Sequence, residues 1–129
     1  MEQENIKHLF KRTLVNFLDE IINILPSEPD LIVARIYVND KSTPEDLLNF
    51  FILNFSPHRK AIETKNEKVF LDSERDNKTG KSIFGSLSDD KINHFKYLWR
   101  SGVINNDNKE VIWKWLNSFI KIMDKYQTS

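Results

Sequence analysis

Chemistry is suggested first by the triplet Gly80-Lys81-Ser82, which resembles the end of a phosphate-binding loop. The full motif needs a second glycine five residues before Gly80, where this chain has Arg75. It also needs a buried strand directly in front of the loop, and the apolar residues 69–71 are too few and too distant. We therefore interpret residues 72–82 as a polar surface loop that binds no nucleotide.

The same loop begins with acidic residues at alternate positions, as a calcium-binding loop does. Asp72, Glu74 and Asp76 supply the first three of these positions. The sixth position of such a loop should be glycine and is Asn77, and the twelfth should be a bidentate glutamate and is Ile83. A hydrated loop explains these charges more simply than a bound cation.

Other catalytic and metal-binding patterns are not found in the sequence. The histidines are His8, His58 and His94, and none is followed by a histidine or carboxylate three or four residues later. The chain has no cysteine, which excludes disulfides, thiolate nucleophiles and cysteine-ligated metals. No serine has the GxSxG context. Carboxylate pairs that meet only in the folded chain stay open, but we expect no enzyme and no cofactor.

Charge argues against nucleic acid as the main partner. Lys plus Arg is 19 and Asp plus Glu is 19, so the formal net charge is zero, whereas broad electrostatic capture of nucleic acid needs a basic surplus. Residues 57–82 have a surplus of two bases, interleaved with acids. A nucleic-acid-binding or transcription accessory domain is therefore the alternative that we do not favour. Its candidate bases are Arg59, Lys60, Lys65, Lys68, Arg75, Lys78 and Lys81.

Size and hydropathy predict one soluble domain over residues 1–129. Hydrophobic residues make up 40% and charged residues 29% of the sequence, a balance typical of globular proteins. The N-terminus is polar and acidic, unlike a signal peptide. The longest apolar stretch, residues 47–55, is far shorter than the roughly 20 residues that cross a membrane. We expect an intracellular protein without membrane insertion.

The elements that must position any site are helices. Apolar residues recur at steps of three and four over 5–25, and Pro26 ends this pattern. Residues 31–38 fit either a helix or a buried strand, because four of the eight are β-branched. We favour a helix, since Ser27 can cap it and Pro29 suits a first turn.

A second helix start is Thr43-Pro44, and the apolar residues that follow point almost all round the helix axis, which predicts a central core helix over 44–55. Further helices are expected over roughly 58–66, 89–101 and 108–126, with Gly102 as a stop. The predicted fold class is all-α, a compact orthogonal or bundle-like domain of five to six helices.

The tryptophans and the flanks of two helices give the candidate partner-binding residues. Trp99 and Trp115 lie on core stripes. Trp113 and Ile120 lie roughly 110° from the centre of the stripe of their helix, so either this helix buries two faces or the pair forms an apolar patch for a partner. Val15 and Ile22 flank the stripe of the first helix in the same way.

The order of these features resembles a group of small uncharacterised helical proteins of large eukaryotic DNA viruses (mimivirus-, phycodnavirus- and iridovirus-like). The matching segments are FKRTLVNFLDEIINILPSEPDLIVA, the stretch from Pro57 through KVFL, FKYLW, and NNDNKEVIWKWLNSFIKIMDKY. The resemblance implies a viral, mostly helical protein without known activity, in the host cytoplasm or the virion, and it carries over no catalytic residue.

The residues and the resemblance together predict a non-enzymatic structural or protein-interaction protein, such as a virion or assembly component. Its partner would be another protein or its own copy, held through Trp113, Ile120, Val15 and Ile22. No small-molecule substrate is evident.

Overall fold

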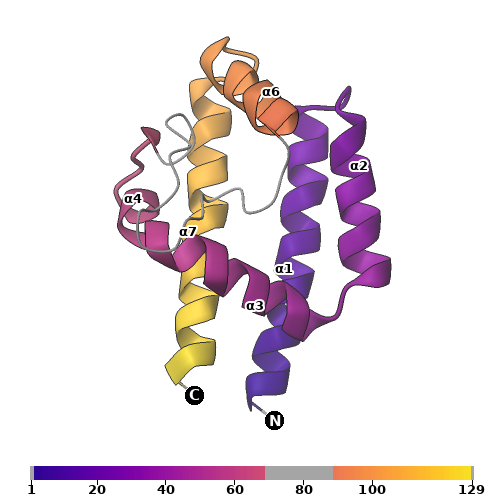
Figure 1. Ribbon diagram of the computed structural model, residues 1–129, viewed down its shortest axis with the longest axis vertical. Helices are drawn as coiled ribbons and strands as arrows, with labels where there is room; N and C mark the ends of the chain where they lie inside the picture. Colours follow the sequence, from indigo (N-terminus) through magenta and orange to yellow (C-terminus); the bar gives the residue numbers. More distant parts are fainter. Residues whose placement is uncertain (1, 69–88, 129) are drawn as a thin grey trace. The chain divides into compact units, whose positions relative to one another are not determined.

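The computed structural model describes residues 2–68 and 89–128, and within these ranges it is all-α, as predicted, with no strand (Figure 1). The described helices are α1 (Glu2–Ile24), α2 (Pro29–Ile36), the π-helical turn η1 (Tyr37–Lys41), α3 (Pro44–Phe55), the 3-10 turn η2 (Ser56–His58), α4 (Arg59–Glu63), α6 (Asp89–Arg100) and α7 (Asn106–Thr128). The apolar anchors expected at 69–71 and 83–87 and the loop expected over 72–82 lie outside the described residues.

The chain forms two compact units, and each is described by itself. The first unit is Met1–Ile52 with Ser118–Ser129, and the second is Leu53–Asn117. The division falls inside α3 and inside α7, so both helices contribute residues to both units. The single domain predicted over 1–129 stays a prediction.

Aromatic side chains fill the centre of the first unit. Phe10 on α1 is completely buried, and its ring centroid lies 5.2 Å from that of Phe51 and 5.5 Å from that of Phe119. Phe17 meets Phe119 edge-on at 5.4 Å. Each such pair contributes about 0.5–1.5 kcal/mol beyond the burial of its surface. The predicted stripe of α1 is confirmed by its buried residues Ile6, Phe10, Leu14, Leu18 and Ile21.

The segment left open between helix and strand is a helix, α2, that lies beside α1 (Figure 1). Pro29 occupies its first turn as predicted, but Glu28 rather than Ser27 is the N-cap residue, with an extended backbone and no side-chain capping bond. The predicted Ser27 cap is therefore wrong. The residue before a proline is pushed out of the helical region, which fixes the boundary at Glu28.

Helix α3 begins as predicted, because the backbone N–H of Asp46 donates to Oγ1 of Thr43 at 3.1 Å. The expected burial all round the axis is wrong. Leu48 is fully buried, whereas Phe50 and Leu53 are 45% and 51% exposed. An apolar helix surface becomes core only where another element covers it.

In the second unit, α6 ends and α7 begins through local backbone chemistry. Gly102 has φ of 88°, a left-handed conformation that favours glycine, and it stops α6 as predicted. Asn105 then caps α7: its Oδ1 accepts from the N–H of Asn108 at 2.8 Å, and the Oδ1 of Asn108 accepts from the N–H of Asn105 at 3.3 Å. This reciprocal arrangement starts α7 two residues earlier than predicted.

Candidate protein-interaction surface

Two residues of α7, Trp113 and Ile120, were predicted to contact a partner, but their side chains point into the interior. Trp113 and Ile120 are each only 3% exposed. Trp113 meets the buried Trp99 edge-on, with ring centroids 5.8 Å apart and an interplanar angle of 83°. Helix α7 therefore buries two faces, the other arrangement that the sequence left open, and the prediction of an accessible patch at Trp113 and Ile120 is corrected.

Val15 and Ile22 are half-buried. On a helical wheel they share one side of α1 with Lys11 and Asp19. Lys11 donates to the carbonyl of Ser42 at 2.8 Å, and Asp19 is hydrogen-bonded to Arg35 of α2. The side of α1 that carries Val15 and Ile22 is thus the side on which α2 and the segment after η1 are fastened.

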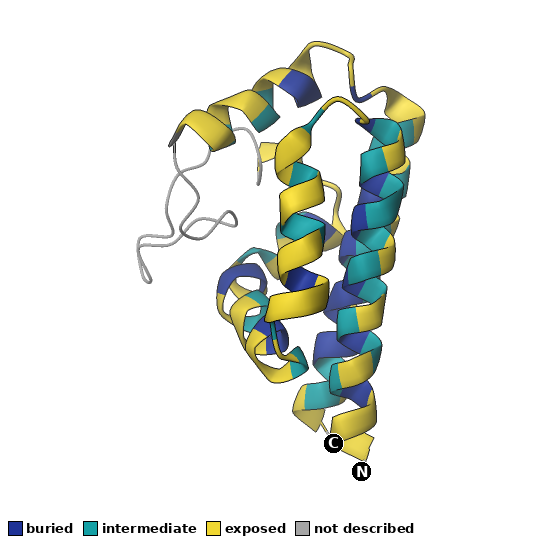
Figure 2. Cartoon of the chain, turned by 90° about the vertical axis from the view of Figure 1, so that its right-hand side faces the viewer, coloured by how far each residue is buried: buried dark blue, intermediate teal, exposed yellow. Residues whose placement is uncertain are grey.

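Most of the large apolar side chains that are exposed in the described part of the first unit lie on α2 and η1; Phe50 on α3 is a further one. Val33 and Tyr37 are 64% and 57% exposed, and Ile32 and Ile36 are 45% and 46% exposed. Figure 2, viewed from the side on which α2 lies in Figure 1, shows the ribbon of α2 mostly in the exposed colour. We call these four residues the α2 face.

Helical geometry explains why this face exists. Positions 32, 33, 36 and 37 fall on one side of a helix, and positions 31, 34 and 38 fall on the opposite side. Val38 is buried and Leu31 and Ala34 are half-buried, so this second side is the one covered within the unit. A run with seven apolar residues out of eight supplies two apolar sides, while α1 covers only one.

The α2 face is held in place by bonds in the last turn of α2 and in the segment that follows it. Arg35 bonds to Asp19 of α1, and this hydrogen bond raises the pKa of Arg35, so the guanidinium stays charged. At the C-terminal end, Ser42 Oγ donates to the carbonyl of Tyr37 at 3.1 Å, and Lys11 holds the carbonyl of Ser42. Such surface ion pairs contribute only about 0–1 kcal/mol each, but they fix the orientation of the helix. A face fixed before binding loses less entropy on association.

The size of the α2 face fits a binding surface. Four side chains that are about half exposed present roughly 400 Å² of largely apolar surface, within the range where the largest patch on a soluble protein is often functional. The sequence leaves 31–38 open between a helix and a buried strand, and it predicts none of these four residues as a partner surface. The available signal was the excess of apolar residues over what one covered side of a short helix can use.

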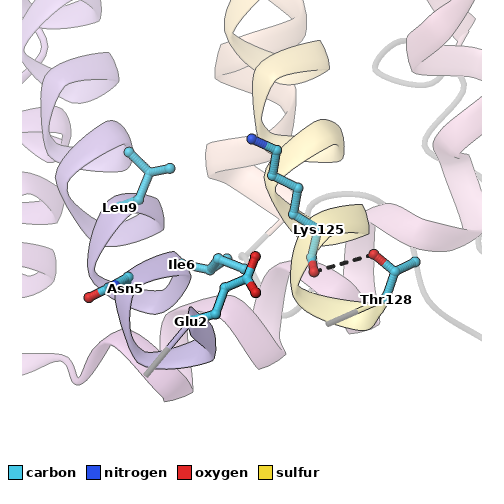
Figure 3. A pocket seen from close by; sticks show the side chains of 6 residues that line it. All are labelled: Glu2, Asn5, Ile6, Leu9, Lys125 and Thr128. Carbon is cyan, nitrogen blue, oxygen red and sulfur yellow. Dashed lines mark hydrogen bonds between the residues drawn. The ribbon is translucent and has the colours of Figure 1, made fainter.

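A shallow groove is the other candidate in the first unit (Figure 3). It has a volume of about 380 Å³ and lies between the start of α1 and the end of α7. Most of its polar lining residues are exposed to solvent. Small-molecule sites instead enclose their ligand with a few convergent polar groups, so this groove has no evident chemistry. Its lining residues are Glu2, Asn5, Ile6, Leu9, Lys125 and Thr128.

The basic residues of the nucleic-acid alternative are partly neutralised in the second unit. Arg59 Nε lies 2.8 Å from a carboxylate oxygen of Glu63, and Lys65 Nζ lies 2.7 Å from one of Glu110. A base already paired with an acid attracts phosphate less strongly. Three further candidate bases, Arg75, Lys78 and Lys81, lie outside the described residues.

The histidines and acids form no metal centre in residues 2–68 and 89–128. His8 and His94 are exposed and His58 is half-buried. Within these ranges, no three histidine, aspartate or glutamate side chains lie close enough together to hold a metal ion. The segment with calcium-like spacing, 72–83, and the triplet at 80–82 lie outside them.

No helix among the described residues has both the length and the apolar character needed to cross a bilayer.

Comparison with known proteins supplies no relative from which a function could be transferred. The resemblance to viral proteins stays a prediction. No protein-family model, curated protein or solved structure matches the chain.

Proposed function

We propose that this chain is a non-enzymatic protein-interaction module that binds another protein chain through the α2 face. The observation that supports this proposal is the exposure of Ile32, Val33, Ile36 and Tyr37 on a helix that is otherwise fastened to α1. In the viral setting that the resemblance implies, the bound chain is a virion or assembly component within the infected cell.

The energy available from burying this face limits the kind of partner surface that can bind it. Removing roughly 400 Å² of apolar surface from water yields about 10 kcal/mol at about 25 cal/mol per Å². Association costs an estimated 4–15 kcal/mol or so in lost freedom. The α2 face therefore has to meet a largely apolar surface on the partner, because the gain on one side alone is offset by this cost.

The two alternatives receive less support from the described residues. The nucleic-acid-binding alternative depends on basic residues, and two of these, Arg59 and Lys65, already form ion pairs with acidic residues. An enzyme needs a pocket that gathers reactive groups, and the described groove holds only Glu2 and Lys125 as charged groups, both exposed.

Site-specific photo-crosslinking tests the proposal. A benzophenone amino acid replaces Val33, the most exposed residue of the α2 face, and in a control chain it replaces Asn16, an exposed polar residue of α1. Both chains are expressed in their native host and irradiated. We expect a protein adduct of defined mass from position 33, and we expect Ile36→Asp in the same chain to remove it.

Two results would contradict the proposal. The first is an adduct yield at position 33 no higher than at position 16. The second is an adduct that nuclease removes and protease does not, which would support nucleic acid instead.

A further inference from the structure

We propose that Thr43 is a phosphorylation site for a proline-directed protein kinase, and that Lys11 of α1 binds the phosphate that Thr43 receives. Thr43 lies in the short link between the end of η1 at Lys41 and the start of α3 at Pro44. This link is outside the α2 face, so the site is independent of the proposed function.

The chain has two places where a hydroxyl residue precedes a proline. They are Thr43-Pro44 and Ser56-Pro57, since the other two prolines follow Leu25 and Glu28. Proline-directed kinases recognise a proline directly after the acceptor residue. Its ring favours an extended backbone at the acceptor, and it has no N–H that needs a partner in the kinase cleft.

The backbone around Thr43 already has the form that a kinase cleft accepts. Protein kinases bind the acceptor in an extended, exposed segment. Ser42 is extended, with φ of −111° and ψ of 140°, and Thr43 is exposed and lies outside both neighbouring helices. Thr43 is therefore presented to an enzyme without unfolding of α2 or η1.

Only the first turn of α3 has to open for the residues after Thr43 to enter the cleft. Two bonds close this turn: the N–H of Asp46 donates to Thr43 Oγ1 at 3.1 Å, and the N–H of Leu47 donates to the Thr43 carbonyl at 3.1 Å. Glu45 and Asp46 are exposed, so opening the turn as far as Asp46 uncovers no core side chain. Such helix ends open at low free energy.

Ser56 has the stronger sequence motif but the less accessible backbone. Arg59 follows it at the third position, which some proline-directed kinases favour. However, Ser56 begins the 3-10 turn η2, and the residues before it, Asn54 and Phe55, are 3% and 9% exposed. Extending this segment would pull Phe55 into water, so the structure favours Thr43 and makes Ser56 a matched control.

The phosphoryl transfer uses the magnesium–ATP that the kinase holds. Thr43 Oγ1 attacks the γ-phosphorus, a new O–P bond forms, and the bond from that phosphorus to the departing ADP breaks. The hydroxyl proton passes to the catalytic aspartate of the kinase. The helix cap survives, because Oγ1 only accepts a hydrogen bond there and phosphate oxygens can accept the same N–H of Asp46.

Lys11 is placed to bind the phosphate. Its Nζ donates to the carbonyl of Ser42, the residue before Thr43, at 2.8 Å. An ammonium group has three donors, so Lys11 can keep this bond and add one to a phosphate oxygen. Lys7, one turn earlier on α1, lies 3.6 Å from a carboxylate oxygen of Glu45 and offsets the repulsion between that acid and the phosphate.

Phosphorylation of the purified full chain by a mitogen-activated protein kinase, read by mass spectrometry of its peptides, tests the site. We expect one phosphate, on Thr43. Thr43→Asn should gain none, and asparagine keeps the helix cap. Ser56→Ala should be phosphorylated as fast as the wild type. We also expect phosphorylated Thr43 in the chain isolated from its native host.

Three results would overturn the site. The first is no phosphate transfer to the folded chain. The second is transfer to Ser56 in place of Thr43. The third is a Thr43 peptide that carries no phosphate in the native host.

Thermal unfolding tests the role of Lys11. The difference in Tm between wild type and Lys11→Gln should be about 2–4 °C larger with the phosphate than without it, because a charged pair is then lost as well. Arg12→Gln is the matched control, since Arg12 is an exposed base on the next position of α1 and should show no such increase. Equal differences with and without the phosphate would overturn the binding of phosphate by Lys11.

Discussion

Replacing Trp113 by alanine tests the reassignment of this residue from a partner surface to the interior. Trp113 is 3% exposed and meets Trp99 edge-on at 5.8 Å. Trp99 also lies under a cation, since Lys109 Nζ is 5.0 Å from its ring centroid. Truncating Trp113 removes one wall of this cluster and leaves a cavity.

The expected cost follows from the burial. Large aromatic to alanine substitutions in a core cost about 3–5 kcal/mol. The lost edge-to-face pair with Trp99 accounts for about 0.5–1.5 kcal/mol of this. For a chain of this size, 1 kcal/mol corresponds to roughly 3–5 °C in Tm, so we expect a fall of about 10–20 °C.

Urea unfolding followed by far-UV circular dichroism and by tryptophan fluorescence measures this loss. Tyr97→Ala is the control, because Tyr97 is 62% exposed on α6 and its truncation should change stability by no more than about 0.5 kcal/mol. A Trp113→Ala chain that keeps its stability to within about 1 kcal/mol, while losing association with a protein, would refute the reassignment. It would restore the interpretation of Trp113 as a partner anchor.

Three further predictions concern local structure. Gly102→Ala should cost about 1 kcal/mol in thermal unfolding, because φ of 88° strains a residue with a Cβ although no atom stands within 4 Å of it; an unchanged Tm would contradict this. Asn105→Ala should cost about 1 kcal/mol through loss of the α7 cap, and Asn105→Asp should retain most of it, as urea midpoints would show. The hydrogen bond between Lys7 and Glu4 lowers the pKa of Glu4 below its ordinary 4.5 and raises that of Lys7 above 10.5. The stability that the Lys7–Glu4 hydrogen bond adds is therefore fully present between pH 4.5 and pH 10.5, the ordinary pKa values of the two groups. It is lost as pH falls through the lowered pKa or rises through the raised one, so the Tm difference between wild type and Lys7→Gln should be constant from pH 5 to 10 and shrink below about pH 4.

Helix positions were accessible to sequence reasoning because their signals are local. Pro26, Thr43 and Gly102 act on their own backbone or that of the next turn, and each marks a helix end in the structure. The N-cap of α2 was misplaced by one residue. Pro29 forces an extended backbone on Glu28, and this effect outweighs the preference of Ser27 for a capping position.

Which apolar side is covered could not be predicted, because that depends on packing between distant segments. A helical wheel places Trp113 and Ile120 off the stripe of α7, yet only the fold brings Trp99 against Trp113. For α2 the sequence favoured a helix over a buried strand but did not show which apolar side would be covered, and Val33 proves to be 64% exposed.

The central claim is that the α2 face is bound by a protein chain, and the adduct yield at position 33 relative to position 16 tests it most directly. We predict a discrete protein adduct that appears only at position 33 and disappears when Ile36 is changed to aspartate. Equal yields at the two positions, or an adduct that persists in the Ile36→Asp chain, would contradict the claim.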